Sequence, residues 1–557
     1  MVSRLWLQDA ASLAMDALLA RLDLEHGARP FFWVDLREQP PQAHHSSWDY
    51  CDIAGRFVDA LPLAREITGR TDAAGIEAEL RRFLWRQQDR ETGLFMSPDT
   101  ELPDGEATKY TPDDRDRAGQ GHADMFAQRG PLLAMATLLA MGDESVRSRA
   151  NRMVAGLSAI AERHGDELCF PAYRWARDLR SEWRAGHNVP ERWLGYRYAL
   201  LTGLARYVEL TDDPTATDLA VGLARWYMRH GDVPPDGRFR ANTHSGGVLP
   251  TAVGIARLGL HTGDREMIDW AHRVYAWVRE QTPDFGFLLD GLGLEGPFST
   301  TCETCGLADL IHLGVLLSEA RVGDYWDDVE RTVRNQLIEN QYADEDALRR
   351  ALPGISDRVL AMLHGGFECA ASPNGLLLYD GAEACCIGGG VRALYIAWRA
   401  SIDENGDWTR VRMGLTRSTP FVDVVGHEPW EGRIDVRLRS PGRVLVRVPD
   451  HASIDGARAL VDGRDVAPRR LGRYVVLDDL RPGQVVSLRY PLSERRCSYE
   501  VVGMGYEADW RGHTVVEMRP AGTRYPTYQR RHSATADRGS SSNPWPLAAP
   551  ESASALW

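Results

Sequence analysis

The sequence predicts a mainly α-helical protein with β structure toward its C-terminal end: a barrel (toroid) of six α-helix pairs followed by an antiparallel β-sandwich. Two observations lead to this fold class. Apolar helical stretches, each broken by a short turn, repeat through the first two thirds of the chain. From about Arg410 the hydrophobic pattern changes from a helical to an alternating period. With 557 residues, the chain is also too long for one ordinary domain.

The helical repeat is marked by turns that lie roughly 50 to 75 residues apart, the length of a helical hairpin with a long connection. They are Thr68-Gly69-Arg70, Met141-Gly142-Asp143, Thr211-Asp212-Asp213, Thr262-Gly263-Asp264 and Val322-Gly323-Asp324. Residues 308–320 are apolar on most of the helix circumference, as in an inner ring, whereas the helix starting near Tyr325 is charged and amphipathic, as in an outer ring. A sixth hairpin near residues 389–401 would close a toroid. An open solenoid is the alternative.

Three segments in the last third have one apolar and one polar face, as the strands of a sandwich do. They are residues 433–439, 443–448 and 485–490, separated by turns at Pro441-Gly442, Asp462-Gly463 and Pro482-Gly483. We therefore expect the helical barrel at residues 1–408 and the sandwich at 409–532. A Ser-, Ala- and Pro-rich tail at 533–557 is expected to be disordered.

The composition is that of a soluble globular protein, with 43% hydrophobic and 26% charged residues. The net charge is -14 and no Lys/Arg-rich run stands out, so nucleic acid is not an expected partner. No apolar run approaches the length that crosses a bilayer, and the N-terminal segment is typical of an amphipathic helix rather than a signal peptide. We therefore expect no membrane partner and a cytoplasmic location. There the cysteines are thiols or metal ligands more often than disulfides.

Two cysteine clusters carry the chemistry that the sequence suggests. Residues 302–305 (Cys-Glu-Thr-Cys) open one predicted helix, and residues 385–390 (Cys-Cys-Ile-Gly-Gly-Gly) open another. A helix start favours thiolate over thiol, and thiolates that converge from two such sites form a zinc pocket. A zinc that only staples two loops and a set of buried, inert cysteines are the alternatives. Adjacent cysteines can hardly pair with each other without strain.

The motif Glu303-Thr304-Cys305, followed later by Cys385-Cys386, resembles glycoside hydrolase family 127, the β-L-arabinofuranosidase family. Looser likenesses to the same family are Trp48-Asp49-Tyr50 with Gly55-Arg56, Asn242-Thr243-His244 with Thr262-Gly263-Asp264, Arg392-Ala393-Leu394-Tyr395, and Gly472-Arg473-Tyr474 with Arg481-Pro482-Gly483. The resemblance covers most of the chain and agrees with the fold class expected from the hydrophobic pattern.

The resemblance implies that Glu303, Cys305, Cys385 and Cys386 bind zinc. It also implies that Cys385 attacks the anomeric carbon and forms a thioglycosyl intermediate, so that configuration is retained. Zinc would hold the sulfur ionised at neutral pH. Cys302 competes with Glu303 as the fourth ligand because Cys-x-x-Cys is a common zinc spacing. We favour Glu303 because it matches the family.

A retaining mechanism needs a proton donor across the scissile bond from the nucleophile. The family places this glutamate upstream of the Glu-x-Cys motif, where the present sequence departs from the family pattern. Glu295 has the right residue type but lies close to the metal motif, whereas Asp290 lies nearer the expected distance with a shorter side chain. Both stay candidates, and an exposed loop carboxylate is the alternative for either.

Sugar hydroxyls are expected to meet histidines in Gly-flanked loops. His244 is the best candidate, because it occupies the segment where the family has a substrate-binding histidine. His122 and His187 are further candidates, for which a structural histidine is at least as good an interpretation. Trp48 could stack on a sugar face, although core packing is the commoner fate of tryptophan.

The leading hypothesis is a retaining exo-acting glycosidase that releases a terminal furanose-like sugar, first of all β-L-arabinofuranose, from an oligosaccharide or small glycoside. A carboxylate-dependent hydrolase or sugar epimerase on the same barrel is a second hypothesis. A carbohydrate-binding or scaffold protein with a structural zinc is a third. A homodimer is compatible with the sequence, which does not demand one.

Overall fold

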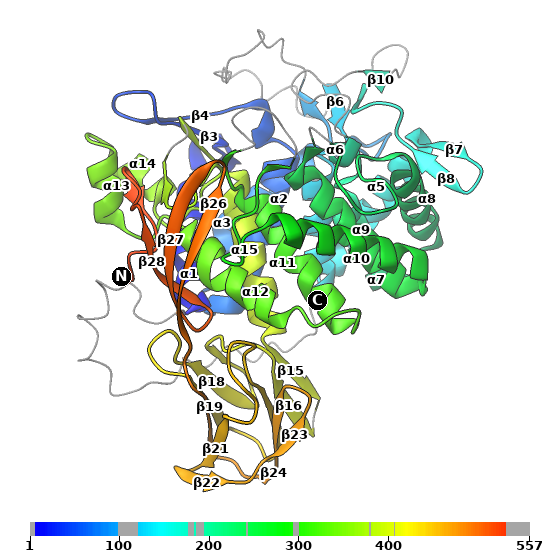
Figure 1. The fold of residues 1–557 in the computed structure, drawn as a ribbon. Helices are drawn as coiled ribbons and strands as arrows, with labels where there is room; N and C mark the ends of the chain where they lie inside the picture. The colour runs from blue at the N-terminus through cyan, green and yellow to red at the C-terminus, as the bar shows by residue number, and fades with distance from the viewer. Residues whose placement is uncertain are drawn as a thin grey trace.

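The structure is a computed structural model in which a helical barrel stands on a β-sandwich, with a further sheet along the side of the barrel (Figure 1). It describes residues 6–98, 121–176, 183–184, 194–240, 243–292, 300–377, 380–405 and 407–530. Among these residues, no helix combines the length and the apolar character that crossing a membrane requires.

Six helices form the inner ring of the barrel, and each packs against the next along the chain. They are α2 (Asp52–Thr68), α4 (Arg129–Ala140), α7 (Leu201–Thr211), α9 (Ser245–Thr262), α11 (Thr304–Glu319) and α15 (Cys385–Ala400). Because α15 packs against α2, the ring is closed. The predicted toroid is therefore confirmed, and the open solenoid is excluded.

The outer ring covers the apolar backs of these helices. Its helices are α3 (Ala74–Arg86), α5 (Arg147–Ile160), α8 (Pro214–His230), α10 (Arg265–Gln281), α12 (Trp326–Thr332) and α1 (Leu7–Ala20). The first five follow their inner partners across the turns that the sequence predicted. The sixth pair closes differently: α1, the first helix of the chain, packs against both α15 and α2. The barrel is therefore completed by joining the two ends of the helical region.

Neighbouring inner helices come very close at the ends where they begin. A Cβ atom on Gly130, in the first turn of α4, would lie only 2.2 Å from the backbone oxygen of Asp52 in the first turn of α2. Only glycine allows this approach. It brings the first turns of these two helices, with Arg56 and Arg129, to the same end of the barrel.

Short strands surround that end of the barrel. Two of these sheets position residues discussed below: β3 (Trp33–Asp35), β4 (Gln42–His44) and β14 (Gly381–Glu383) form one, and β11 (Thr243–His244) and β12 (Gly291–Leu292) form the other. The other strands and α-helices described in the helical region are β1 (Leu22–Asp23), β2 (Arg29–Pro30), β5 (Ser97–Pro98), β6 (Gly121–Asp124), β7 (Glu162–His164), β8 (Glu167–Cys169), β9 (Arg174–Ala176), β10 (Trp183–Arg184), α6 (Leu194–Tyr198), α13 (Glu345–Ala351), α14 (Asp357–Leu363) and β13 (Gly375–Leu376).

The sandwich has two sheets with an apolar core of their own between them. One sheet contains β15 (Ile402–Asn405), β16 (Trp408–Val411), β20 (Gly442–Arg447), β24 (Tyr474–Leu480) and β23 (Arg469–Leu471). The other contains β17 (Arg417–Ser418), β18 (Val422–Gly426), β19 (Arg433–Leu438), β25 (Val485–Arg489), β21 (Arg458–Val461) and β22 (Arg464–Val466). Pairing is antiparallel as predicted, except that β16 runs parallel to β20.

The last described part of the chain differs from the expected domain division. Strands β26 (Glu494–Val501), β27 (Met504–Arg511) and β28 (Thr514–Arg519) form a separate sheet whose apolar side chains join the barrel core. Trp510 is among the most deeply buried of them. The sandwich core thus comprises residues from Ile402 to Tyr490, and the segment from 494 to 530, assigned above to the sandwich, packs on the helices. The predicted tail at 533–557 lies outside the described residues.

A buried histidine ties the three parts together. His513, in the turn between β27 and β28, is 1% exposed. Its Nε2 lies 2.8 Å from Asp450 Oδ1 of the sandwich, and its Nδ1 lies 3.8 Å from Glu330 Oε2 of α12. Burial alone would lower its pKa, but these carboxylates outweigh burial and raise the pKa of His513 to about 9. The imidazolium therefore holds the sandwich and the side sheet to the barrel.

We expect His513→Gln to lower the free energy of unfolding by about 3 kcal/mol below pH 6.5, since each pKa unit corresponds to about 1.4 kcal/mol. The folded pKa is raised, so this stabilisation is complete below the unfolded pKa. It is lost as the pH rises through about 9. Denaturant unfolding of both proteins between pH 6 and 10 measures it, with exposed His164→Gln as the control. A difference that does not change with pH would contradict the assignment.

Candidate active site

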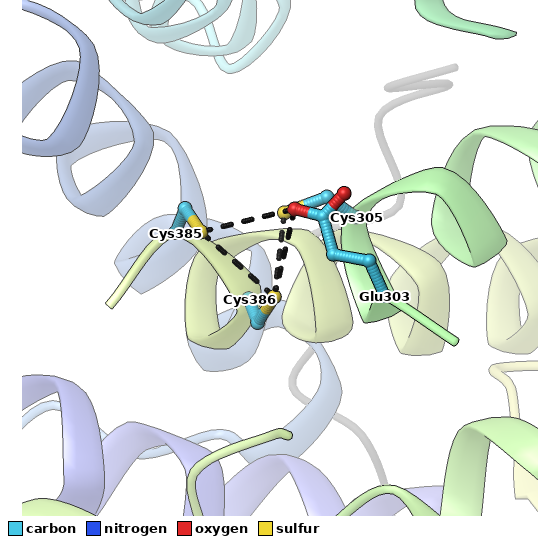
Figure 2. A group of neighbouring side chains, drawn as sticks. All are labelled: Glu303, Cys305, Cys385 and Cys386. Carbon is cyan, nitrogen blue, oxygen red and sulfur yellow. Dashed lines mark hydrogen bonds between the residues drawn. The ribbon is translucent and has the colours of Figure 1, made fainter. Parts of the chain in front are cut away.

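Three thiols and one carboxylate meet where α11 and α15 begin (Figure 2). Glu303 is the residue before α11 and Cys305 lies in its first turn, whereas Cys385 and Cys386 open α15. The Sγ atoms of Cys305 and Cys386 are 3.7 Å apart, and those of Cys385 and Cys386 are 3.8 Å apart. Glu303 Oε1 lies 4.0 Å from Cys385 Sγ and 3.9 Å from Cys386 Sγ. Each of the four residues can therefore direct one ligand atom to a common point.

Two local features bring the second cysteine pair to this point. Strand β14 pairs with β3, and the Ala384 N–H donates to Phe32 O at 2.8 Å, which fixes the start of α15. At Gly389 a Cβ atom would lie 3.3 Å from Cys305 Sγ, tighter than ordinary packing. Glycine therefore lets α15 approach the first turn of α11 closely.

The donor set fits a soft divalent metal ion. Three sulfurs and one carboxylate oxygen are the ligands and the number that tetrahedral zinc prefers. The other oxygen of Glu303, Oε2, is buried without a hydrogen-bond partner among the described residues, which is unusual for a carboxylate. Cys302 does not join the group: its Sγ accepts a weak hydrogen bond from Asn340, and burial raises its pKa to about 12. The geometry favours Glu303 over Cys302 as the fourth ligand.

The charge of this group is partly balanced by one arginine. Arg56 Nη1 donates to Cys305 Sγ at 3.2 Å, while its Nε lies 2.9 Å from the Asp52 carboxylate. Hydrogen bonds from the Cys385 and Cys386 thiols, helped by Arg56, hold the pKa of Cys305 well below its usual value. The pKa of Cys385 is raised well above its usual value, first by its hydrogen bond to Cys305. Among the protein's own charges, Cys305 is therefore the sulfur that ionises first.

A carboxylate–imidazole pair lies beside the cysteines. Strands β11 and β12 pair so that His244 lies opposite Gly291, next to Asp290. The His244 Nε2 is 2.7 Å from Asp290 Oδ1 and 3.6 Å from Glu303 Oε2. Burial opposes the charge on His244, but Asp290 outweighs it and raises the pKa of the imidazole. Two residues predicted from the sequence, Asp290 and His244, thus lie together beside Glu303 and the three cysteines.

The structure adds Glu383, which the sequence analysis did not identify. Its Oε2 lies 3.4 Å from Cys385 Sγ, and burial raises its pKa to about 7. Glu383 ends β14 two residues before Cys385. The signal that the sequence offered was a charged residue at the end of a short apolar segment, two positions before a cysteine. Tyr196 is a second addition, with its hydroxyl 3.2 Å from His244 Nδ1.

The remaining predicted residues lie at different places. A row of rings leads away from His244: its centroid is 5.2 Å from Tyr196, Tyr196 is 4.6 Å from Phe126, and Phe126 is 6.3 Å from Trp48. The row connects Trp48 to the site. His122 belongs to another sheet, where its Nε2 lies 3.4 Å from Asp124 Oδ2. The predictions for Glu295 and His187 fall outside the described residues.

No family model matches the sequence, and no curated protein matches it either. The fold does match solved structures. A β-L-arabinofuranosidase of glycoside hydrolase family 127 from Geobacillus stearothermophilus T6 has a TM-score of 0.58 at 15% identity, over 84% of this chain and 77% of that one. A second family 127 β-arabinofuranosidase has a TM-score of 0.58 at 14% identity, over 92% and 81% of the two chains. Cellobiose 2-epimerase from Spirochaeta thermophila has a TM-score of 0.50 at 13% identity, over 70% and 94%.

These likenesses establish the fold. The chain has the architecture of family 127 glycoside hydrolases, a barrel of paired helices with a β-sandwich, as the motif resemblance predicted. Of these three structures, the epimerase matches the smallest share of this chain.

Arg56 provides a test of the charge balance at the site. Arg56→Met would leave the fully buried Asp52 carboxylate short of its nearest cation, and we expect it to destabilise the protein by about 3–5 kcal/mol. Adding Asp52→Asn should restore part of this loss, so that the two changes are not additive. Denaturant unfolding measures both effects. Arg349→Met, which breaks an exposed ion pair, is the control and should lower the stability by less than about 1 kcal/mol. Additive effects would contradict the pairing.

Proposed function

We propose that this protein is a retaining glycoside hydrolase whose nucleophile is Cys385. The observation that carries the proposal is the meeting of Cys385 with two other thiols and a carboxylate at the start of two inner helices. Of the adjacent cysteines, Cys386 is 0% exposed and Cys385 is 8% exposed. Cys386 contacts Cys305 between the helices, whereas Cys385 faces the Glu383 side. Cys385 is therefore the less buried of the two, which favours it as the nucleophile.

Glu303, Cys305, Cys385 and Cys386 would hold zinc, for which their donor atoms are suited. When bound, zinc supplies the positive charge that keeps the cysteine sulfurs ionised at neutral pH. Arg56 lies against Cys305 and would offset part of the excess negative charge of three thiolates and a carboxylate. His244 lies near Glu303 Oε2 and would orient that carboxylate.

The reaction proceeds in two displacements. Cys385 Sγ attacks the anomeric carbon, forming a C–S bond as the C–O bond to the leaving group breaks. The leaving oxygen takes a proton from a carboxyl group on the opposite side. Water then attacks the same carbon, the C–S bond breaks, and that carboxylate accepts the proton of the water. We assign the proton transfer to the pair of Asp290 and His244: the Asp290 carboxylate would pass on the proton that the His244 imidazolium carries, and return a proton to His244 when water attacks. Glu295 stays the alternative, and Glu383 is a third candidate beside the nucleophile.

The substrate class follows from the resemblance and from the lining of the site. We infer a terminal furanose-like sugar at the end of an oligosaccharide or small glycoside, with β-L-arabinofuranose as the first choice, in line with the names of the structural neighbours. His244 would bind a sugar hydroxyl, and Trp48 would flank the sugar at the end of the row of rings. The predicted homodimer and cytoplasmic location stay predictions.

The nucleophile is tested by a cyclophellitol- or bromoacetamide-type arabinofuranose probe. We expect one zinc per chain and a single adduct on Cys385, found by intact-protein mass spectrometry, peptide mapping and metal analysis of the same sample. Cys385→Ser should lose the adduct and the release of sugar, whereas the matched variant Cys302→Ser should keep both. Zinc missing from a well-folded sample would contradict the mechanism. Sugar release that survives in Cys385→Ser would favour a carboxylate-dependent hydrolase or epimerase, and binding without release a carbohydrate-binding protein.

The proton donor is tested by comparing two leaving groups. Without its acid, an enzyme still releases nitrophenol, which needs little protonation, but not an alcohol. We therefore expect Asp290→Asn to lower kcat/KM on a methyl arabinofuranoside by about 10²–10⁴-fold and much less on the 4-nitrophenyl glycoside. Glu383→Gln, beside the nucleophile, should lower both to a similar extent. The reverse pattern would make Glu383 the acid, and no leaving-group effect in either variant would point to Glu295.

A further inference from the structure

Two histidines and an aspartate outside the candidate active site meet near the start of the chain. Asp23 ends β1 and caps the short 3-10 helix that follows it (Leu24–His26), whose last residue is His26. His45 comes directly after β4. Asp23 Oδ2 lies 2.5 Å from His26 Nδ1 and 3.0 Å from His45 Nε2. Each of the three side chains therefore directs one nitrogen or oxygen atom to a common place.

The far side of the His45 ring is held by a buried carboxylate. His45 Nδ1 lies 2.8 Å from Asp49 Oδ2 and 3.3 Å from Pro30 O, and two acceptors at this nitrogen require that it carries a hydrogen. Asp49 is 0% exposed and accepts from Arg29 Nε at 2.9 Å. The ring also stacks on Phe31, with centroids 4.0 Å apart. It is therefore fixed with Nε2 facing the aspartate that the two histidines share.

A positive charge is needed where His45 faces Asp23. With the hydrogen on Nδ1, a neutral imidazole presents a lone pair at Nε2. That lone pair and a carboxylate oxygen 3.0 Å away repel each other unless a proton or a metal cation lies between them. The same oxygen of Asp23 also faces His26 Nδ1. Imidazole nitrogens and carboxylate oxygens are both common ligands of first-row divalent metal ions.

We propose that Asp23, His26 and His45 bind a divalent metal ion, zinc or a similar first-row ion, at a site separate from the cysteines. Two imidazoles and one carboxylate are a protein ligand set of zinc sites that keep one position open. Asp49 behind His45 is the outer partner that a metal-bound histidine usually has. The side chain of His26 is 31% exposed, so the ion enters from this side and water completes its coordination. The ion would join the first strand of the chain to the segment that leads into α2.

Binding requires a small movement of the ligands. Zinc bonds of about 2.0–2.1 Å in a tetrahedron place the ligand atoms about 3.3 Å apart. The Nδ1 of His26 therefore moves about 0.8 Å away from Asp23 Oδ2, and the Nε2 of His45 about 0.3 Å. The larger movement falls on His26, the least buried of the three side chains, and the smaller one on the ring that Asp49 holds.

An imidazolium offers another account of the same contacts. A protonated His45 would bridge Asp23 and Asp49 without a metal ion, with Arg29 balancing the remaining charge. The two accounts differ in one measurable respect, because a network held by protons takes up no metal ion. Three ligands of this kind also bind zinc more weakly than thiolates do. A sample purified without added metal is therefore expected to hold zinc at the cysteines alone, and the ion proposed here binds when metal is added.

The experiment adds cobalt(II) to the full-length protein as purified, in a slightly alkaline buffer in which protons compete least for the ligands. Equilibrium dialysis counts the bound cobalt, and the absorption spectrum identifies its ligands. Cobalt binds more weakly than zinc to a given site, so it leaves zinc at the cysteines in place. We expect about one cobalt per chain with weak visible bands and a raised thermal midpoint. The spectrum should lack the sulfur-to-cobalt band that an ion at the cysteines would give, which keeps the two sites distinguishable.

Two variants remove one ligand each. His26→Gln and Asp23→Asn should each weaken cobalt binding about 10–100-fold or more, since even the loss of an outer partner has an effect of this size. The matched control is His261→Gln. The His261 side chain is 28% exposed and its Nε2 lies 3.0 Å from Asp212 Oδ1, so it forms a histidine–aspartate pair of similar exposure. This control should bind cobalt like the wild type.

Two results would overturn the proposal. One is a wild-type protein that takes up cobalt only with a sulfur band, or takes up none. The other is a His26→Gln protein that is folded, as judged by its circular dichroism, and binds cobalt as the wild type does. Asp23→Asn keeps nearly the same side-chain shape, so it provides a second folded variant in which unchanged binding would also contradict the site.

Discussion

The common direction of the inner helices governs the chemistry of this molecule. Ring closure by α15 against α2 brings the helix starts to one end of the barrel, where their backbone N–H groups and macrodipoles favour negative charge. Three cysteines and Glu303 gather at that end. The same constraint sends the helix C-termini to the other end, where four arginines and three carboxylates line a cavity. The direction of the inner helices thus fixes which end of the barrel has the positive ends of the helix dipoles and which has the negative ends.

Two buried ion pairs join inner helices inside the barrel. Arg129 of α4 donates to Asp309 of α11 at 2.7 Å, and Arg392 of α15 donates to Asp59 of α2. Each pair joins two inner helices, and each is fully buried. Buried ion pairs contribute little net stability compared with apolar packing, but removing one partner is costly. The Arg392–Asp59 pair therefore links two neighbouring helices, whereas the Arg129–Asp309 pair links two helices across the ring. Both specify the arrangement of the helices more than they stabilise it.

Much of the fold could be predicted because it is local. The turns after α2, α4, α7, α9 and α11, and the strands at residues 433–438 and 485–489, have patterns that a short window of sequence contains. What failed depends on contacts between distant segments. The sheet from Glu494 to Arg519 has the same alternation as a sandwich strand, and only its packing on the barrel distinguishes it. In the same way, nothing near α1 indicates that it covers α15.

The same difference between local patterns and distant contacts decides which residues of the candidate site could be predicted. The two cysteine motifs were visible because each has a spacing, and the meeting of Cys305 with Cys386 followed from the resemblance. Arg56 was quoted only within a loose family likeness, with no role assigned to it. Glu383 was not singled out, because one charged residue two positions before a cysteine is a weak signal. Yet these two decide the charge around the thiols. Arg56 favours a thiolate at Cys305, whereas Glu383 stands beside Cys385. The protein's own residues thus lower the pKa of the Cys305 thiol and raise that of Cys385. A cation bound by all three sulfurs would extend ionisation to Cys385. The nucleophile would therefore depend on the other ligands of that cation.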